Sequence, residues 1–489
     1  MKRYFAVIII IFILSGYSSF PQGKTKNNTK EKETPQELFD DAEFFYESED
    51  YKEALYDYLL LHDQKPDNAN INFHIGMCYL NIPGEEKKAV PFLEQAVTKI
   101  STKYKSTFEE TRAPLHAMFY LGIAYRIDNQ LTKSVDVLTK FRNNRNFEGN
   151  YNESMVDQEI QSSQRAKMIQ DNPINIRRTN LGPPINNNAA NYNPVVTTDE
   201  SIIVYVNSLK FYNAIYMSRK ENGVWSEPVN ISPQVGSDGD CEPTCISANG
   251  KDLYLVKKTK NNFHLYASHW KDSSWTQMVA LNKNINSSKN ENHASISADG
   301  KTLYFTSDRR GGFGKFDIYK SEKDASGDWG PAVNLGNKIN TEFNESTPFI
   351  CEDGKTLYFS SEGHLNMGGY DVFVSHLKAD KQWEEPTNAG FPINTTGNDL
   401  FYYPLKNGKI AYYSLILPEG YGDKDIYRIE NLTVAAQDNT ITGQKSKIKK
   451  IIVRDKETNE ILGIMQYDEE ADSLKVQQKN DKIIINIDQ

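Results

Sequence analysis

Carboxylates return at fixed places in the middle of this chain, and acids at regular spacing are candidates for acid–base catalysis or metal binding. One series follows the triplets Ile-Asn-Ser or Ile-Asn-Thr: Glu291, Glu345 and Asp399. A second series follows Gly-containing turns and begins a strand-like segment: Asp317, Asp371 and Asp425. A catalytic pair would break the symmetry of a repeat rather than follow it. We therefore predict that both series accept hydrogen bonds from their own turns, with metal binding as the alternative for the second.

Other residue types give little support to an enzyme. The eight His are scattered, and neither a His-Glu-x-x-His helix nor a Gly-x-Ser-x-Gly elbow is present. We therefore expect a non-enzymatic protein that needs no cofactor and no metal.

The four cysteines are few for an exported chain of this length, so disulfides are not expected to be its main support. Cys241 and Cys245 do not form a Cys-x-x-C motif. A disulfide between them and two free, half-buried thiols both remain open, and Cys78 is expected to be a core thiol.

Residues at which the repeats differ from one another are the best candidates for a binding site. Asp308, Arg309 and Arg310 begin one Gly-rich insertion, and Glu362 and His364 stand at the corresponding place in the next repeat. Long turns on one rim of a rigid scaffold create an asymmetric surface of the kind that binds ligands or proteins. The alternative is an ordinary solvated rim.

The repeat itself predicts the architecture. Five copies start at Ile185, Val235, Ile285, Ile339 and Ile393. Alternating apolar residues and turn signals in each copy predict four short antiparallel strands, the content of a propeller blade. The fold class is therefore multidomain, α plus all-β, with a five-bladed β-propeller and six blades as the alternative.

Closure of the ring is also predicted. The segment Asn180-Leu181-Gly182 matches Asn334-Leu335-Gly336, which ends the third copy, whereas the fifth copy lacks this ending. We therefore expect residues 177–182 to form a strand of the last blade, beside residues 425–429. An open ring would leave an unpaired sheet edge.

The N-terminus resembles a cleaved secretory signal over residues 1–18, with two basic residues, a short apolar run and small residues at the cleavage positions. A polar tether is predicted for residues 19–34. Cleavage would change the formal net charge from −9 to −11, which argues against nucleic-acid binding.

Residues 35–172 resemble tetratricopeptide repeats, which implies an α-solenoid with a cap helix over residues 153–170. The matching positions are Leu38, Ala42, Phe45, Tyr51, Ala54, Tyr58 and Pro66, then Gly76, Tyr79, Ala89, Leu93 and Ala96, then Gly122, Tyr125, Ser134 and Leu138. Small residues there are expected to let paired helices approach closely. Pro114 is expected in the first turn of a helix.

The blocks NLGNKINTEFNESTPFICEDGKTLYFSSEGHLNMGGYDVF and GYGDKDIY and the segment NPINIRRTNLGPPIN extend this resemblance. Together they are similar to the TolB-type, WD-like propeller proteins of Gram-negative envelopes. Within that group the likeness is to the tetratricopeptide–propeller PorE/OmpA-family proteins. It implies a propeller over residues 173–432 and a short β-rich tail over residues 433–489, a reduced form of a carboxypeptidase-regulatory-like domain. Nothing resembles the OmpA-type domain, so peptidoglycan anchoring is not expected.

We expect a periplasmic adaptor or scaffold that associates with the outer membrane and binds envelope proteins through its helical groove and its propeller rim. The alternative is a propeller that binds a glycan or a peptide in its central channel. Neither the partner nor membership of a secretion system follows from the sequence.

Overall fold

A computed structural model describes residues 34–259 and 262–433, together with the backbone of four strands between residues 448 and 487. The chain divides into two compact units, Met1–Asn431 and Leu432–Gln489. The predicted signal and almost all of the predicted tether lie outside the described residues. None of the described helices is long and apolar enough to cross a membrane.

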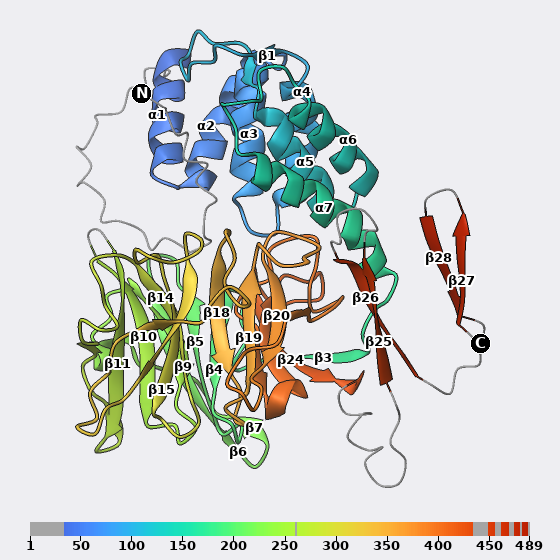
Figure 1. Cartoon of the computed structure of the whole chain (residues 1–489). Coiled ribbons are helices and arrows are strands. Elements are labelled where there is room, and N and C mark those ends of the chain that lie inside the picture. Colours follow the sequence, from blue (N-terminus) through green and yellow to red (C-terminus); the bar gives the residue numbers. More distant parts are fainter. Residues whose placement is uncertain are drawn as a thin grey trace, which may run out of the picture. The chain divides into compact units, whose positions relative to one another are not determined.

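The first unit begins with a region of paired helices (Figure 1). These are α1 (Pro35–Glu47), α2 (Tyr51–Gln64), α3 (Ala69–Leu80), the 3-10 turn η1 (Glu86–Lys88), α4 (Ala89–Ala96), α5 (Ala117–Ile127), α6 (Leu131–Arg142) and α7 (Glu153–Gln170). Polar N-caps define several starts, and Thr34 forms a capping box with Glu37. Pro114 lies in the two-residue strand β2 (Ala113–Pro114), which pairs with β1 (Ile100–Ser101), so its predicted place in a helix was wrong.

Two glycines let the helix pairs pack closely, as predicted. A Cβ added to Gly76 would lie 2.5 Å from Cγ of Leu93, and one added to Gly122 would lie 2.5 Å from Cγ of Leu138. Any larger residue would push α3 from α4, or α5 from α6.

The rest of the first unit is a five-bladed β-propeller (Figure 1). Blade 1 contains β4 (Asn191–Val196), β5 (Ile202–Ser208), β6 (Asn213–Glu221), β7 (Val224–Trp225) and β8 (Val229–Asn230). Blade 2 contains β9 (Cys241–Ile246), β10 (Asp252–Lys258), β11 (Phe263–Lys271), β12 (Ser274–Trp275) and β13 (Val279–Ala280), and follows the one-turn helix α8 (Ser232–Val235). Blade 3 contains β14 (Glu291–Ile296), β15 (Thr302–Ser307), β16 (Asp317–Glu322) and β17 (Val333–Asn334).

Blade 4 contains β18 (Glu345–Ile350), β19 (Thr356–Ser361), β20 (Asp371–His376) and β21 (Thr387–Asn388). Blade 5 contains β22 (Tyr403–Leu405), the turn η2 (Lys406–Gly408), β23 (Ile410–Leu415), β24 (Asp425–Asn431) and, from the start of the propeller, β3 (Ile176–Asn180).

The alternation predicted within each strand places side chains on the two faces of a blade, and both faces are buried. In β15, Leu303 and Phe305 belong to a large core cluster shared with earlier blades, while Tyr304 packs in a separate cluster with Leu357 and Phe359 of blade 4. Stacking each small sheet between two others removes both faces from water.

The ring closes as predicted, although the closing strand covers residues 176–180 rather than 177–182. β3 pairs antiparallel with β24 from Asn180 opposite Tyr427 to Ile176 opposite Asn431. Asn180 also donates from Nδ2 to Oδ2 of Asp425 at 2.8 Å. The strand that precedes blade 1 in sequence therefore completes blade 5, and the blade count is five.

The second unit contributes two separate antiparallel hairpins, β25 (Ile448–Arg454) with β26 (Ile461–Asp468) and β27 (Leu474–Lys479) with β28 (Lys482–Ile487). These strands include the short β runs expected in the tail. Its likeness to a carboxypeptidase-regulatory-like domain stays a prediction.

Candidate functional site: the loop face and axial channel of the propeller

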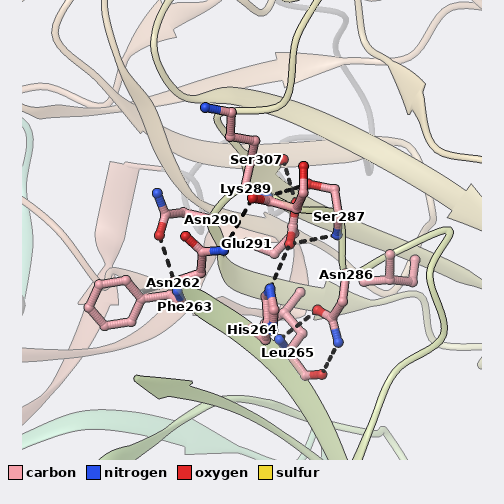
Figure 2. A network of polar contacts seen from close by, with 12 residues as sticks. Asn262, Phe263, His264, Leu265, Asn286, Ser287, Lys289, Asn290, Glu291 and Ser307 are labelled. Carbon is pink, nitrogen blue, oxygen red and sulfur yellow. Dashed lines mark hydrogen bonds and ion pairs between the residues drawn. The ribbon is translucent and has the colours of Figure 1, made fainter. Parts of the chain in front are cut away.

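The first series of acids caps its own turns. Glu291 accepts from the backbone N of Ser287 at 2.9 Å, from its hydroxyl at 2.6 Å and from Oγ of Ser307 at 2.9 Å (Figure 2). Glu345 accepts from the backbone N of Thr341 at 3.0 Å and from its hydroxyl at 2.7 Å. The prediction that these acids accept hydrogen bonds from their own turns is confirmed.

In blades 5, 1 and 2 the position of this glutamate holds a different residue. Asp399 accepts from the backbone N of Thr395 at 2.6 Å and from the Tyr413 hydroxyl at 2.9 Å. Asn191 takes the acid's place in blade 1, and Cys241 takes it in blade 2. All four cysteines, which lie among the described residues, are buried and free, so Cys241 and Cys245 form no disulfide.

The second series of acids also bonds local backbone groups. Asp317 accepts from the backbone N of Phe313 at 2.7 Å, and Asp371 from that of Met367 at 2.8 Å. Asp425 repeats the contact with Tyr421 at 2.6 Å. Among the residues that the structure describes, no three His, Cys, Asp or Glu side chains gather as a metal site.

Asparagines one residue after the repeat start join neighbouring blades, a role that sequence analysis missed. The Asn286 amide in blade 3 accepts from the backbone N of Leu265 at 2.8 Å and donates to its backbone O at 2.9 Å, in blade 2 (Figure 2). Asn186 makes the same pair of bonds with Ile426 across the closing junction. The recurrence of Asn at this place in the sequence was the available signal.

Two of the three predicted rim residues in blade 3 have structural partners. Asp308 accepts from the backbone N of Asn290 at 2.6 Å. The Arg309 guanidinium donates to the backbone O of Ile285 at 2.6 Å and lies 3.3 Å from Glu291. Arg310 is exposed. Their predicted role in binding is untested and stays a prediction.

The predicted residues of blade 4 lie in a loop that contacts α7. Glu362 is buried, which raises its pKa to about 7, and it accepts from Nδ2 of Asn344 at 2.7 Å. His364 bonds the backbone O of Ile339 at 2.9 Å, and its pKa is lowered by burial. Gln158 of α7 donates to the backbone O of Glu362 at 2.7 Å. These residues therefore lie in the joint between α7 and the blade 4 loop, while a binding role stays a prediction.

Asn366 is the centre of this joint. It is buried, and its side-chain oxygen accepts from Arg165 at 3.0 Å and from the Ser162 hydroxyl. Nearby, Arg126 of α5 is also buried, pairs with Glu159 at 2.9 Å and donates to the backbone O of Thr396. The predicted cap helix α7 therefore contacts the propeller as well as the end of the helical region.

One end of the blades carries most of the exposed large apolar side chains of the propeller. We define the loop face as the end that bears the turns before the first strands and the connections between the second and third strands. The antiparallel register places these segments together, for example Glu291 opposite Ser307 and Ser307 opposite Asp317. The connections expose Phe211, Tyr212, Phe313, Leu365, Ile416 and Tyr421, and the exposed fractions reach 71% at Phe211 and 52% at Phe313.

A small cavity lies on the propeller axis, because all five blades line it. Equivalent residues stand at its wall: Asn193, Pro243, His293, Thr347 and Phe401. A second cavity lies further along the first strands, and Phe349 and Tyr403, with ring centroids 4.4 Å apart, line both.

The backbone at the axial cavity is strained. Asn193, Thr347 and Phe401 have φ of 50°, 42° and 62°, where residues other than glycine are uncommon. Such outliers persist where surrounding structure enforces them, and they gather at functional sites. Beside the cavity, Glu242 is half-buried and accepts from Asn193 at 2.7 Å, and desolvation raises its pKa to about 7.

No family model and no curated protein matches the chain. Among solved structures, TolB from Acinetobacter baumannii aligns at 17% identity with a TM-score of 0.33, covering 50% of this chain and 54% of that protein. The catalytic domain of a GH62 α-L-arabinofuranosidase from Coprinopsis cinerea aligns at 11% identity with a TM-score of 0.36, covering 53% and 98%. The chain spans about half the length of the first of these proteins, and both likenesses are distant.

Proposed function

We propose that the protein is a non-enzymatic adaptor of the cell envelope, exported to the periplasm, that binds a partner protein on the loop face of its propeller. The observation that supports this proposal most strongly is the set of exposed aromatic side chains on that face. Phe211, Tyr212 and Phe313 stand on the connections of blades 1 and 3 and are 71%, 42% and 52% exposed.

Aromatic residues are enriched at protein interfaces because they bury large areas with few rotatable bonds. Single exposed apolar residues are normal on any surface, but here they recur at one structural position, the connection between the second and third strands of a blade. Loops held by a rigid ring suit such a role, since the scaffold fixes their positions before the partner arrives.

The bonding of the acids supports binding over catalysis. Glu291 and Glu345 each accept at least three hydrogen bonds from their own blade, and Asp317 accepts from two backbone N–H groups of its turn. A general acid or base must reach the substrate proton that it moves, and these carboxylates are directed at structural donors.

The axial cavity supports a second candidate function, uptake of a ligand in the channel, because aromatic residues and strained backbone converge there. Its volume is about 30 Å³, room for about two water molecules. A sugar ring needs more space, so this candidate favours a small group such as a peptide side chain over a glycan.

Photo-crosslinking in the native cell tests the adaptor proposal. A benzoylphenylalanine replaces Phe211 or Phe313 in the full chain, and Val279 or Val333 on the outer strands serves as the control, since these are 66% and 54% exposed. We expect a discrete crosslinked protein from the first two positions and none from the controls. Equal crosslinking from all four, or none at all, would reject the loop face as the binding surface.

A further inference from the structure

The loop face is divided by charge. On blades 1 to 3 it carries exposed or half-buried cations: Lys210, Lys257, Lys258, Lys289, Arg310 and Lys315. Among the described residues, the same turns carry only three acids outside the core: Asp238 and Asp240, which lie 3.7 Å and 3.0 Å from Nζ of Lys257, and Asp308, which accepts from Asn290. This part of the face therefore has a surplus of positive charge.

That surplus does not reflect the composition of the chain, which has a formal net charge of −9. On blades 4 and 5 the corresponding turns and connections instead carry three exposed acids, Glu342, Glu419 and Asp423, and one half-buried lysine, Lys424. Basic residues are thus gathered on one part of one face of an acidic protein, which is a pattern associated with electrostatic steering of an anionic partner.

Three of the six cations occupy the same loops as the exposed aromatic residues of blades 1 and 3. Nζ of Lys210 lies 5.1 Å from the centroid of the Phe211 ring, and Arg310 and Lys315 flank Phe313 in sequence. A partner that fits this surface presents carboxylates together with apolar side chains. Long-range attraction would raise the association rate, and burial of the aromatic rings would slow dissociation.

We propose that the basic half of the loop face, on blades 1 to 3, binds an acidic polypeptide segment of the partner protein. This inference rests on the proposed adaptor function and adds the chemistry of the partner. The surface itself consists of side chains on three neighbouring blades.

A flat anionic membrane fits this face less well. The helical region contacts the same end of the propeller, through Gln158 with the blade 4 loop and through Gly84, which lies against Ile416 of blade 5. A bilayer laid across the face would also meet Glu342 and the acids of blade 5. A polypeptide segment can cover the basic half alone.

Fluorescence anisotropy with a labelled twelve-residue peptide of alternating Glu and Phe tests the proposal on the full mature chain. We expect binding at about 50 mM salt that weakens about tenfold at about 300 mM, because exposed charges are screened. The variant K210E/K289E/R310E is expected to lose about tenfold or more in affinity. A peptide of alternating Lys and Phe should not bind.

The matched control is K251E/K301E/K355E, which reverses three exposed lysines at equivalent turns on the opposite end of the blades. It makes the same change in net charge and should alter the affinity by less than about twofold. Melting temperatures of both variants show whether the fold is intact.

Equal losses in the two triple variants, or no binding of the acidic peptide by the folded wild type, would overturn the proposal. Binding to phosphatidylglycerol vesicles without binding to the peptide would assign the surface to a membrane instead. A crosslinked partner at Phe211 with no acidic-peptide binding would leave the adaptor function standing and reject only its acidic chemistry.

Discussion

At the scale of single residues, buried acids in this propeller act as structural acceptors, and burial changes their protonation. Glu345 accepts from Thr341 and Ser361 inside the blade, and desolvation raises its pKa from 4.5 to about 8. The folded protein therefore holds a proton at pH values where the unfolded chain releases it. Stability contributed by this group is present at low pH and falls as the pH rises from about 4.5 to about 8.

We predict that Glu345→Gln reduces the loss of stability between pH 5 and pH 8. The amide keeps an acceptor for the turn but cannot ionise, so a penalty of about 4 kcal/mol at pH 8, or about 10 °C in Tm, should disappear. Thermal unfolding at both pH values measures it.

Glu291→Gln at the equivalent turn is the control, because it removes an ion pair with Arg309 at 3.3 Å and should lower Tm at both pH values. An unchanged pH dependence in Glu345→Gln would show that Glu345 is not the titrating group.

The turn roles of Glu291 and Asp317 could be predicted from the sequence because the backbone donors of their turns lie only four residues before them. The recurrence of Asn at the place of Asn286 indicated a structural role, but its partner Leu265 could not be predicted, since the bonds cross from one blade to the next. The predicted rim residues illustrate the same limit: Glu362 was correctly placed in a connecting loop, but its contact with α7 joins residues 204 apart.

At the scale of elements, the structure depends on two long-range joints. β3 closes the ring against β24, and its place could be predicted because the repeat phase left the last blade one strand short. The joint of α7 with the blade 4 loop had no such signal. Sequence analysis predicted the bounds of α7 correctly, but assigned this helix only the role of a solvent-exposed cap on the helical region.

We predict that deletion of residues 177–182 lowers the Tm of the propeller by about 10 °C and promotes aggregation. It removes the backbone ladder to β24 and exposes a strand edge, a loss of several kcal/mol at about 1 kcal/mol per hydrogen bond. Differential scanning calorimetry and light scattering measure both effects.

Truncation after residue 439 is the control, because the β24 ladder ends at Asn431. If this truncation destabilised the propeller and the deletion did not, the account of ring closure would fail.

We also predict that Asn366→Ala loosens α7 from the propeller without unfolding the ring. The variant loses the bonds from Arg165 and Ser162 and leaves their donors without this acceptor, a cost of about 2 kcal/mol. Hydrogen exchange of α7 should become faster, while β15 of blade 3 keeps its protection. Faster exchange throughout the propeller, or no change in α7, would contradict this role of Asn366.

At the scale of the whole molecule, the first unit joins paired helices to a closed ring, and one end of that ring carries exposed aromatic residues and segregated charge. The helix–propeller order and the blade count follow from repeats in the sequence. The loop face could not be predicted from these repeats, because the exposure of the Phe211 and Phe313 side chains depends on how all five blades meet. The central claim is that this face binds a partner protein.

The most direct test is quantitative co-purification from crosslinked cells of the native host, comparing wild type with F211S/F313S and with V279S/V333S. The account predicts that the proteins captured with wild type fall by about tenfold in the loop-face variant and stay unchanged in the outer-strand variant, with equal Tm values. Equal capture by all three proteins would contradict it.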